Sequence, residues 1–86
     1  MRVVCITKSG RDFSREVDEW LEMFARRTGK EIEMIDPDSP AGGSFMRVYD
    51  VVEYPTLLAL DDRGAVLAAW RGLPMPRFDE VSYYAK

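Results

Sequence analysis

The side chains that most often carry out covalent chemistry are scarce in this chain. Its 86 residues include a single cysteine, Cys5, and no histidine. A nucleophile activated by an imidazole is therefore excluded, as is any triad of the Ser-His-Asp kind. One cysteine cannot close a disulfide within the chain, and a zinc site of thiolates and imidazoles needs more ligands than are present. We therefore expect no metal centre of that kind and assign no catalytic residue.

The cysteine itself is better explained by packing than by reactivity. Cys5 stands within the run VVCI, and a free cysteine is among the residue types most often buried. Paired acids could serve as general acid and base, and the chain has two such pairs, at residues 36 and 38 and at residues 61 and 62. Both pairs lie in turn-forming segments, so we interpret them as turn residues.

Arg11 is the remaining candidate for chemistry at a helix start. Free N–H groups at a helix N-terminus attract anions, so Arg11 could pair there with a carboxylate of a ligand or partner. The simpler interpretation, which we favour, is that Asp12 or Ser9 only caps the helix.

Length and composition indicate one globular domain spanning residues 1–86. Hydrophobic residues make up 47% of the chain and aromatic residues 12%, which is ordinary for a packed core. The longest apolar runs are far too short to cross a membrane, and charged residues follow the first run too soon for a signal peptide. We therefore expect a cytoplasmic protein without a membrane segment.

Charge is distributed unevenly along the chain, whose net charge is −3. Residues 31–62 carry eight acidic side chains and one basic side chain, whereas the two flanking segments are each slightly basic. Because no basic face is evident, nucleic acid is not an expected partner. The acidic middle is interpreted as a solvated surface, with repulsion of anions as the alternative.

Two elements are expected in the first third of the chain. Residues 2–7 (RVVCIT) form a β-branched run that is apolar on both faces, as in a central strand. Residues 12–28 have helical periodicity, and Gly29 stands where a C-terminal cap belongs. The apolar stripe of this helix comprises Phe13, Val17, Trp20, Leu21, Phe24 and Ala25.

The middle of the chain is expected to hold a strand, a loop and a short helix. Residues 31–35 alternate polar and apolar side chains, and residues 36–43 (DPDSPAGG) have the composition of a loop. Ser44 is expected to cap a helix that runs to about Val51. This helix would direct four apolar side chains inward: Phe45, Val48, Tyr49 and Val52.

Two strands and a helix should close the chain. Residues 56–60 and 65–70 are expected strands joined by the turn 61–64, and a last helix spans residues 76 to about 84. The order is β-α-β-α-β-β-α, with a right-handed parallel crossover first and an antiparallel hairpin last. This order predicts an α/β fold of the thioredoxin-like class, β-α-β-α-β-β-α, with a four-stranded mixed sheet flanked by helices.

Two segments carry a resemblance to a known family. Residues 3–17 (VVCITKSGRDFSREV) resemble the opening of a glutaredoxin, with Arg11 and Ser14 at the two positions of its Cys-x-x-Cys motif. Residues 49–72 resemble the second half of thioredoxins and glutaredoxins, where a Pro-Thr opens the third strand and a glycine follows the fourth. The chain is thus similar to a divergent member of the glutaredoxin/thioredoxin-like family that lacks the Cys-x-x-Cys motif.

The resemblance implies a location for a binding groove. In the family, the proline equivalent to Pro55 is cis and turns the backbone of Tyr54 outward, where it can pair with an extended peptide or with glutathione. Phe13 and Tyr54 are expected at the edge of this groove, with Tyr49 and Met75 nearby. The implied groove residues are Arg11, Asp12, Phe13, Ser14, Tyr54, Pro55, Thr56, Gly72 and Leu73.

The resemblance also implies how this chain differs from its relatives. Glutaredoxins follow the glycine equivalent to Gly72 with a second glycine and a Ser/Thr-Asp that holds glutathione, whereas this chain has Leu73 and then PMP. We therefore expect no cofactor, with glutathione as the one to test. The leading hypothesis is a redox-inactive domain that binds a protein or peptide partner through the degenerate groove.

Two alternatives stay open at the level of sequence. One is a glutathione-binding or thiol-disulfide oxidoreductase-related role that uses a partner's cysteine, so enzymatic activity is not decided. The other is a structural module in which Tyr83 and Tyr84 seal a dimer. We accordingly expect a monomer or a weak homodimer.

Overall fold

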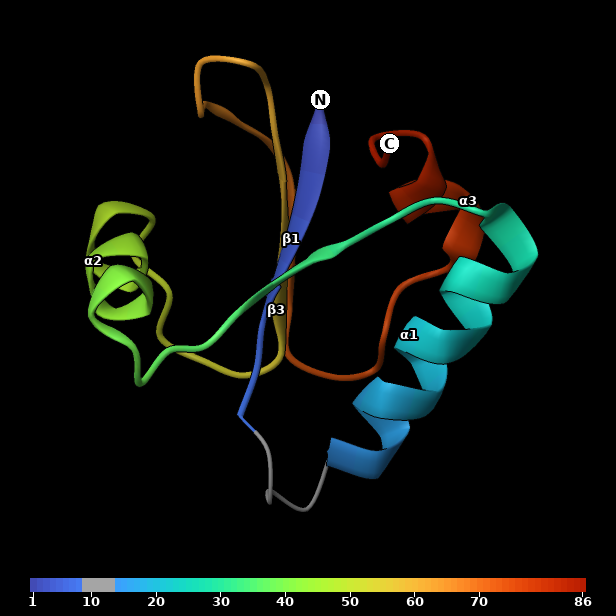
Figure 1. The fold of residues 1–86 in the computed structure, drawn as a ribbon, viewed down its shortest axis with the longest axis horizontal. Helices are drawn as coiled ribbons and strands as arrows, with labels where there is room; N and C mark the ends of the chain where they lie inside the picture. Colours follow the sequence, from blue (N-terminus) through green and yellow to red (C-terminus); the bar gives the residue numbers. More distant parts are fainter. Residues whose placement is uncertain (9–13) are drawn as a thin grey trace.

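The computed structural model describes residues 1–8 and 14–86 of the chain. Four strands form one mixed sheet in the order β2-β1-β3-β4, with β1 parallel to β2 and antiparallel to β3, and β3 antiparallel to β4. Helix α2 covers one face of the sheet, and helices α1 and α3 cover the other (Figure 1). The elements are β1 (Arg2–Ile6), α1 (Ser14–Thr28), β2 (Glu33–Ile35), α2 (Pro40–Val48), β3 (Thr56–Leu60), β4 (Val66–Arg71) and α3 (Phe78–Ser82).

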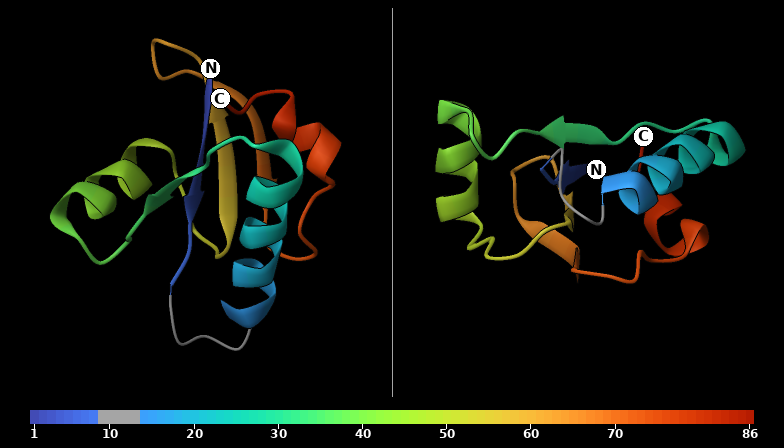
Figure 2. Two further views of the ribbon diagram at one scale, coloured as in Figure 1. Left: turned by 45° about the vertical axis from the view of Figure 1, so that its right-hand side comes forward. Right: turned by 90° about the horizontal axis from the view of Figure 1, so that it is seen from below.

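The two central strands are buried on both faces, as the apolar run in residues 2–7 predicted. Successive side chains of a strand point to opposite faces, so β1 and β3 each contribute to two separate cores. Val3 and Cys5 pack with Leu57 beneath α1 and α3, whereas Val4 and Ile6 pack with residues of α2. The sheet thus separates two apolar cores, and the turned views show helices on its two sides (Figure 2).

Helix α1 follows its predicted apolar stripe. Val17 and Phe24 are buried against the sheet, and Trp20 stacks on Phe24 with ring centroids 5.1 Å apart. The Nε1–H of Trp20 donates to the main-chain oxygen of Pro76 at 2.8 Å, which ties the helix to the segment before α3. Gly29 ends the helix at φ 67°, a left-handed conformation that glycine adopts without the strain of a Cβ, so the predicted cap is confirmed.

Helix α2 begins five residues earlier than the sequence predicted, inside the segment interpreted as a loop. The N-cap is Ser39, whose Oγ accepts a hydrogen bond from the N–H of Gly42 at 2.9 Å, and Pro40 occupies the first turn. Gly42 and Gly43 disfavour a helix, so the sequence pattern indicated a loop in spite of the serine cap and the proline. Because the helix ends at Val48, the predicted inward positions of Val48 and Val52 are wrong: their exposed fractions are 74% and 79%.

The β3–β4 hairpin matches its predicted turn. Gly64 has φ 86°, and the carboxylate of Asp61 accepts hydrogen bonds from the N–H groups of Arg63 and Ala65 at 2.8 and 2.9 Å. These main-chain N–H groups hold the pKa of Asp61 below its ordinary value. Tyr49 donates to the carbonyl oxygen of Gly64 at 2.7 Å, so the end of α2 is tied to the hairpin turn.

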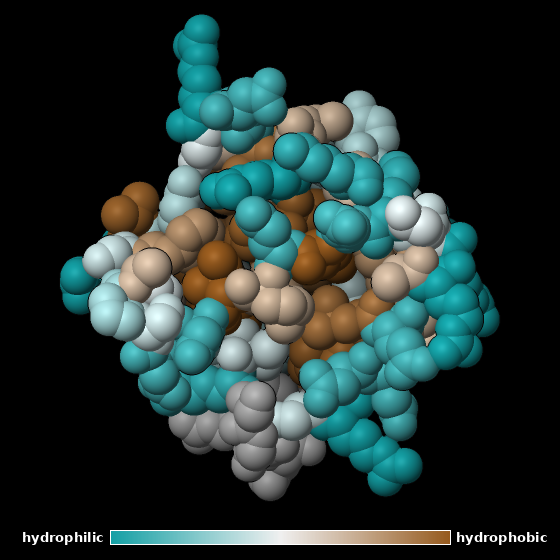
Figure 3. Space-filling view, in the orientation of Figure 1, coloured by the Kyte–Doolittle hydropathy of each residue, from teal (hydrophilic) through white to brown (hydrophobic). Residues whose placement is uncertain are grey.

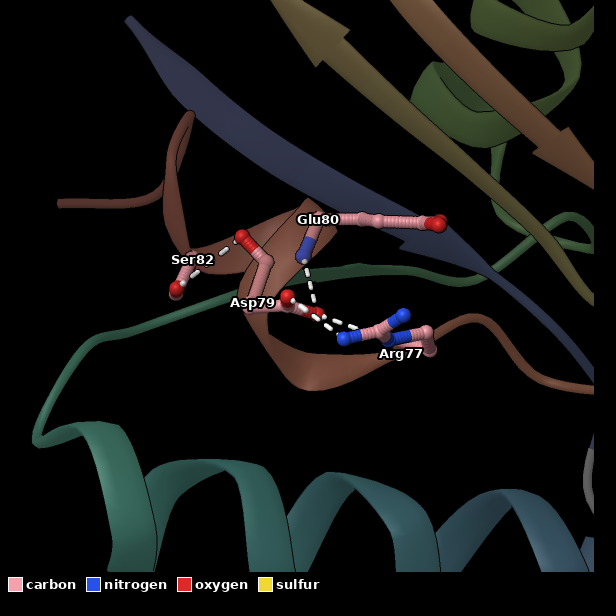
Figure 4. A network of polar contacts seen from close by, with 4 residues as sticks. All are labelled: Arg77, Asp79, Glu80 and Ser82. Carbon is pink, nitrogen blue, oxygen red and sulfur yellow. Dashed lines mark hydrogen bonds and ion pairs between the residues drawn. The ribbon is translucent and has the colours of Figure 1, made fainter.

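Helix α3 is shorter than predicted and covers only Phe78–Ser82. Its first turn is closed by Asp79, whose carboxylate accepts from the Arg77 guanidinium at 3.1 and 2.9 Å and from the N–H of Glu80 at 3.1 Å (Figure 4). Phe78 packs edge-on against Phe24 of α1. None of the helices in the described part of the chain has the length and apolar character that a membrane crossing needs.

Candidate functional site

Three segments converge where β1 ends and β3 begins. Ile6, the last residue of β1, pairs with Thr56, the first residue of β3. Beyond Ile6 the chain continues to Lys8, whose carbonyl oxygen accepts a hydrogen bond from the Ser14 hydroxyl at 3.1 Å. The start of α1 is therefore held beside the end of β1.

The segment before β3 is fixed by hydrogen bonds to its main chain. The Thr56 hydroxyl is fully buried and donates to the carbonyl oxygen of Glu53 at 2.7 Å. Pro55 is buried, the Tyr54–Pro55 peptide bond is cis, and the Pro55 carbonyl oxygen accepts from the N–H of Gly72 at 2.7 Å. Gly72 has φ 72°, and Leu73 after it is 45% exposed. These contacts hold Gly72 and Leu73 beside the segment 54–56, with Pro55 and Thr56 buried beneath.

The main chain of Tyr54 is available for a ligand. Within residues 1–8 and 14–86, no hydrogen bond to its N–H or C=O is formed. Its phenol is half-buried and donates weakly to the sulfur of Met46 in α2 at 3.6 Å. Polar main-chain groups near a groove are satisfied by water or by a bound chain, so this residue has the pairing capacity that an extended peptide needs.

Lys8 is the main charged group at this end of the sheet. Its ammonium nitrogen lies 3.2 Å from a carboxylate oxygen of Asp38 and 5.7 Å from the centre of the Tyr54 ring. The lysine thus links the loop after β2 to the loop before β3. A cation held over an aromatic face in this way is stabilised by about 0.5–1 kcal/mol when partly exposed.

A hollow of about 470 Å³ adjoins Lys8 on the side of β2. Its lining is mostly polar and includes Thr7, Ser14 and three aspartates, Asp18, Asp36 and Asp38. The hydroxyl oxygen of Thr7 is buried and forms no hydrogen bond with any residue that the structure describes. Among the described residues, no group of three or more Cys, Asp or Glu side chains is placed to hold a metal ion.

Thiol chemistry has no support from the geometry of Cys5. The residue lies within β1, is fully buried, and packs between Val3 and Leu57 under α1. Burial, with a further contribution from the negative charge of Asp18, raises the pKa of the thiol from 9.0 to about 12. Because the thiolate is the nucleophile, a thiol with this pKa is inert at neutral pH.

The architecture agrees with that of solved structures of low sequence identity. The chain is similar to thioredoxin 1 from the thermophilic eubacterium Thermosipho africanus, with a TM-score of 0.66 and 17% identity over 98% of this chain and 89% of that one. The fold is thioredoxin-like. A second similar structure, of a malarial protein, gives a TM-score of 0.61 and 18% identity over 81% of this chain and 78% of that one.

The likeness extends to the fold alone. No protein-family model matches the sequence, and no curated protein matches it either. The predicted α/β class, with a four-stranded mixed sheet flanked by helices, is confirmed by the thioredoxin-like architecture. The activity of this thioredoxin-like domain has to be argued from its own residues.

The predicted groove residues divide into those that the structure places and those that lie outside the described residues. Arg11, Asp12 and Phe13 belong to the second group. Ser14 lies at the start of α1, beside Lys8. Tyr54 is joined to this end of the domain by Lys8, as described above.

Two predicted neighbours of the groove lie elsewhere. Tyr49 bonds to the hairpin turn at the far end of β3, because α2 ends at Val48 and directs this side chain toward Gly64. Met75 packs against the core beneath α1 and α3. Sequence reasoning missed Lys8 and Asp38 as a pair, since they are thirty residues apart and only the parallel β1–β2 pairing brings them together.

Proposed function

We propose that this protein is a redox-inactive thioredoxin-like domain that binds a protein or peptide partner through the groove formed by Tyr54, Pro55, Thr56, Gly72 and Leu73, with Ser14 at its border. The observation that carries the proposal is that no described residue pairs with the main chain of Tyr54, together with a sole thiol that is buried in β1. The groove can pair with a chain, and the domain has no accessible thiol of its own.

The chemistry of the groove suits an extended peptide. Strand-like pairing with the N–H and C=O of Tyr54 would provide affinity without sequence preference. Leu73, at 45% exposure, offers an apolar contact beside it, and burying a leucine contributes roughly 1.5–3 kcal/mol. Lys8 adds a positive charge at the border, already shared with Asp38.

The test begins with selection of peptides from a random display library on the wild-type chain, followed by titration of a selected peptide into ¹⁵N-labelled protein. We expect amide shifts centred on residues 54, 56, 72 and 73. The matched variants are Leu73→Asp and Leu67→Asp, because Leu67 is 44% exposed but lies in β4. Leu73→Asp should weaken binding about tenfold, and Leu67→Asp should leave it unchanged.

Two further measurements separate this proposal from a thiol-linked role. The wild-type chain should show no thiol-disulfide exchange with a small disulfide at pH 7, because the pKa of Cys5 is far above neutrality. Millimolar glutathione should leave the amide signals of Tyr54 and Thr56 unchanged. Shifts with glutathione at those amides, or peptide shifts that avoid residues 54–56, would contradict the proposed function.

A further inference from the structure

Strand β2 exposes one edge of the sheet. It is the terminal strand in the order β2-β1-β3-β4, so its outer edge has no strand partner in the part of the chain that the structure describes. The strand lies at one side of the molecule, beside α1 (Figure 2). An unpaired edge presents N–H and C=O groups that can pair with another extended segment.

A hollow of about 560 Å³ lies along this strand, between β2 and the second half of α1. We call it the α1–β2 groove; its floor is apolar and consists of Leu21, Phe24, Ile32 and Met34. The space-filling view shows hydrophobic side chains near the middle of this face, with hydrophilic side chains around them (Figure 3). An apolar floor beside an open strand edge can take the side chains of an added strand, because alternate residues of that strand point toward it.

The rim of the α1–β2 groove is acidic. It comprises Asp18, Glu22, Glu31 and Glu33, with Lys30 as the one cation among the lining residues. Glu22 pairs with Arg26, Glu33 pairs with Arg2, and the Lys30 ammonium donates to the carbonyl oxygen of Ser82 at 2.6 Å. Asp18 and Glu31 form no ion pair with any described residue. The negative charges of Asp18 and Glu31 are therefore not paired with a described cation, and both lie beside the apolar floor.

Acidity continues past the end of β2. The hollow near Lys8 shares Asp18 and Met34 with the α1–β2 groove and adds Asp36 and Asp38, of which Asp38 is paired with Lys8. A ligand lying along β2 would therefore meet negative charge beside the strand and at its C-terminal end. A cationic ligand is attracted by this arrangement and an anionic one is repelled.

We propose that the α1–β2 groove binds an extended basic segment of a partner protein, in which Lys or Arg residues alternate with aliphatic ones. The segment adds to the outer edge of β2, its aliphatic side chains lie on Leu21, Ile32 and Met34, and its cations face the acidic rim. A second copy paired through the same strand would bring a second acidic rim to this edge, and like charges on adjacent strands are destabilising.

This surface is separate from the groove around Tyr54. The α1–β2 groove is lined from residues 18–25 and 30–34, and none of residues 54–56, 72 or 73 contributes to it. Binding at one surface can therefore be mapped independently of binding at the other, and loss of either leaves the other measurable.

The probe is a synthetic decapeptide of alternating lysine and valine, titrated into the ¹⁵N-labelled full chain at low salt. We expect amide shifts at residues 31–35 and on the α1 residues that line the groove, weakening as salt is raised. A decapeptide of alternating glutamate and valine should not bind. Two further probes carry methyl groups on every second main-chain nitrogen of the lysine peptide, one on the lysine nitrogens and the other on the valine nitrogens. One of these two probes should bind about tenfold or more weakly than the other, because its methyl groups block the pairing with β2.

The protein variants test the rim directly. Glu31→Lys should weaken binding of the lysine peptide about fivefold, whereas Glu80→Lys changes net charge equally on exposed α3 and should have no effect. Three results would overturn the proposal: equal binding of both methylated probes, equal binding of the glutamate peptide, or shifts confined to residues 54–56. A concentration-dependent dimer that shields the amides of β2 would instead identify a second copy as the occupant and would also refute it.

Discussion

Adjacent glycines in α2 should respond to alanine in opposite directions. At Gly42, an added Cβ would lie 1.8 Å from the carbonyl oxygen of Asp36 and 2.9 Å from the Oγ of Ser39. At Gly43, no atom lies within 4 Å of the added Cβ. Both residues are in the first turn and a half of the same helix, so the comparison holds sequence context and helix propensity nearly constant.

The destabilisation by Gly42→Ala can be estimated from the main-chain movement that the added Cβ requires. A Cβ essentially never comes within 3.0 Å of another atom, so in Gly42→Ala the helix and the main chain at Asp36 have to separate by more than 1 Å. This overpacking costs about 1–3 kcal/mol. The Ser39 cap, whose Oγ donates to Asp36 at 2.8 Å and accepts from Gly42, is strained by the same movement, which costs up to about 1 kcal/mol more.

Against these costs, alanine in place of glycine within a helix gains about 0.5–1 kcal/mol. The net loss lies between about 0 and 3.5 kcal/mol, so Gly42→Ala should lower the free energy of unfolding by roughly 2 kcal/mol. Gly43→Ala should raise it by about 0.5–1 kcal/mol, since only the gain applies.

The assay is urea unfolding at 25 °C, followed through the fluorescence of Trp20 and Trp70, with the slope of each transition compared to that of the wild type. Neither tryptophan contacts α2, so a shift in midpoint reports global stability. The reasoning is refuted if Gly42→Ala is as stable as the wild type, or if both variants shift in the same direction. Either outcome would mean that the Asp36 carbonyl does not lie against α2.

Further predictions concern Cys5 and Tyr49. The raised pKa of the Cys5 thiol means that the folded state keeps a proton that the unfolded state releases, so the contribution of Cys5 to stability should be constant below pH 9 and fall as pH rises toward 12, by up to ~4 kcal/mol; urea unfolding between pH 9 and 12 should show a shallower decline in Cys5→Ala. In the native state a disulfide reagent should modify Cys5 only at the rate of global unfolding, and rapid labelling would show that β1 opens locally. Tyr49→Phe removes the 2.7 Å bond to the Gly64 carbonyl and should cost about 1 kcal/mol in thermal or urea unfolding; no change would indicate that water replaces the hydroxyl.

The regular part of the fold could be predicted because its signals are local. Residues 56–60 form β3 with the predicted bounds, and the α1 stripe follows a helical period over four turns. Gly29 and Gly64 have the positive φ values that their positions at a cap and a turn require. In each case a short stretch of sequence decides the conformation without reference to distant residues.

Helix α2 shows where local signals fail. The segment 36–43 contains two glycines and two prolines, which together favour a loop, yet Ser39 and Pro40 start a helix there. Glycine disfavours a helix, but Gly42 lies so close to the main chain of Asp36 that only a residue without a Cβ fits at this position. The helix propensities of the residues in this segment do not reveal that contact.

The candidate site was predictable only in part, because its contacts join residues far apart in sequence. The contacts of Lys8 with Asp38 and Tyr54 form because β1 lies between β2 and β3 in the sheet. The hydrogen bond from Gly72 to Pro55 likewise depends on the β3–β4 register. A turn glycine and a strand-opening proline are visible in the sequence, but their contact is a product of the sheet.

The contacts that fix the groove explain how binding can persist without thiols. The segment around Tyr54 is held by the Thr56 hydroxyl bonded to Glu53 and by the Gly72 N–H bonded to Pro55, and both acceptors are main-chain oxygens. Neither bond involves a sulfur atom, and the one thiol is in the core. The conformation of the segment around Tyr54 is therefore fixed by main-chain acceptors and needs no thiol. The proposed binding of a chain at this segment accordingly requires no redox chemistry.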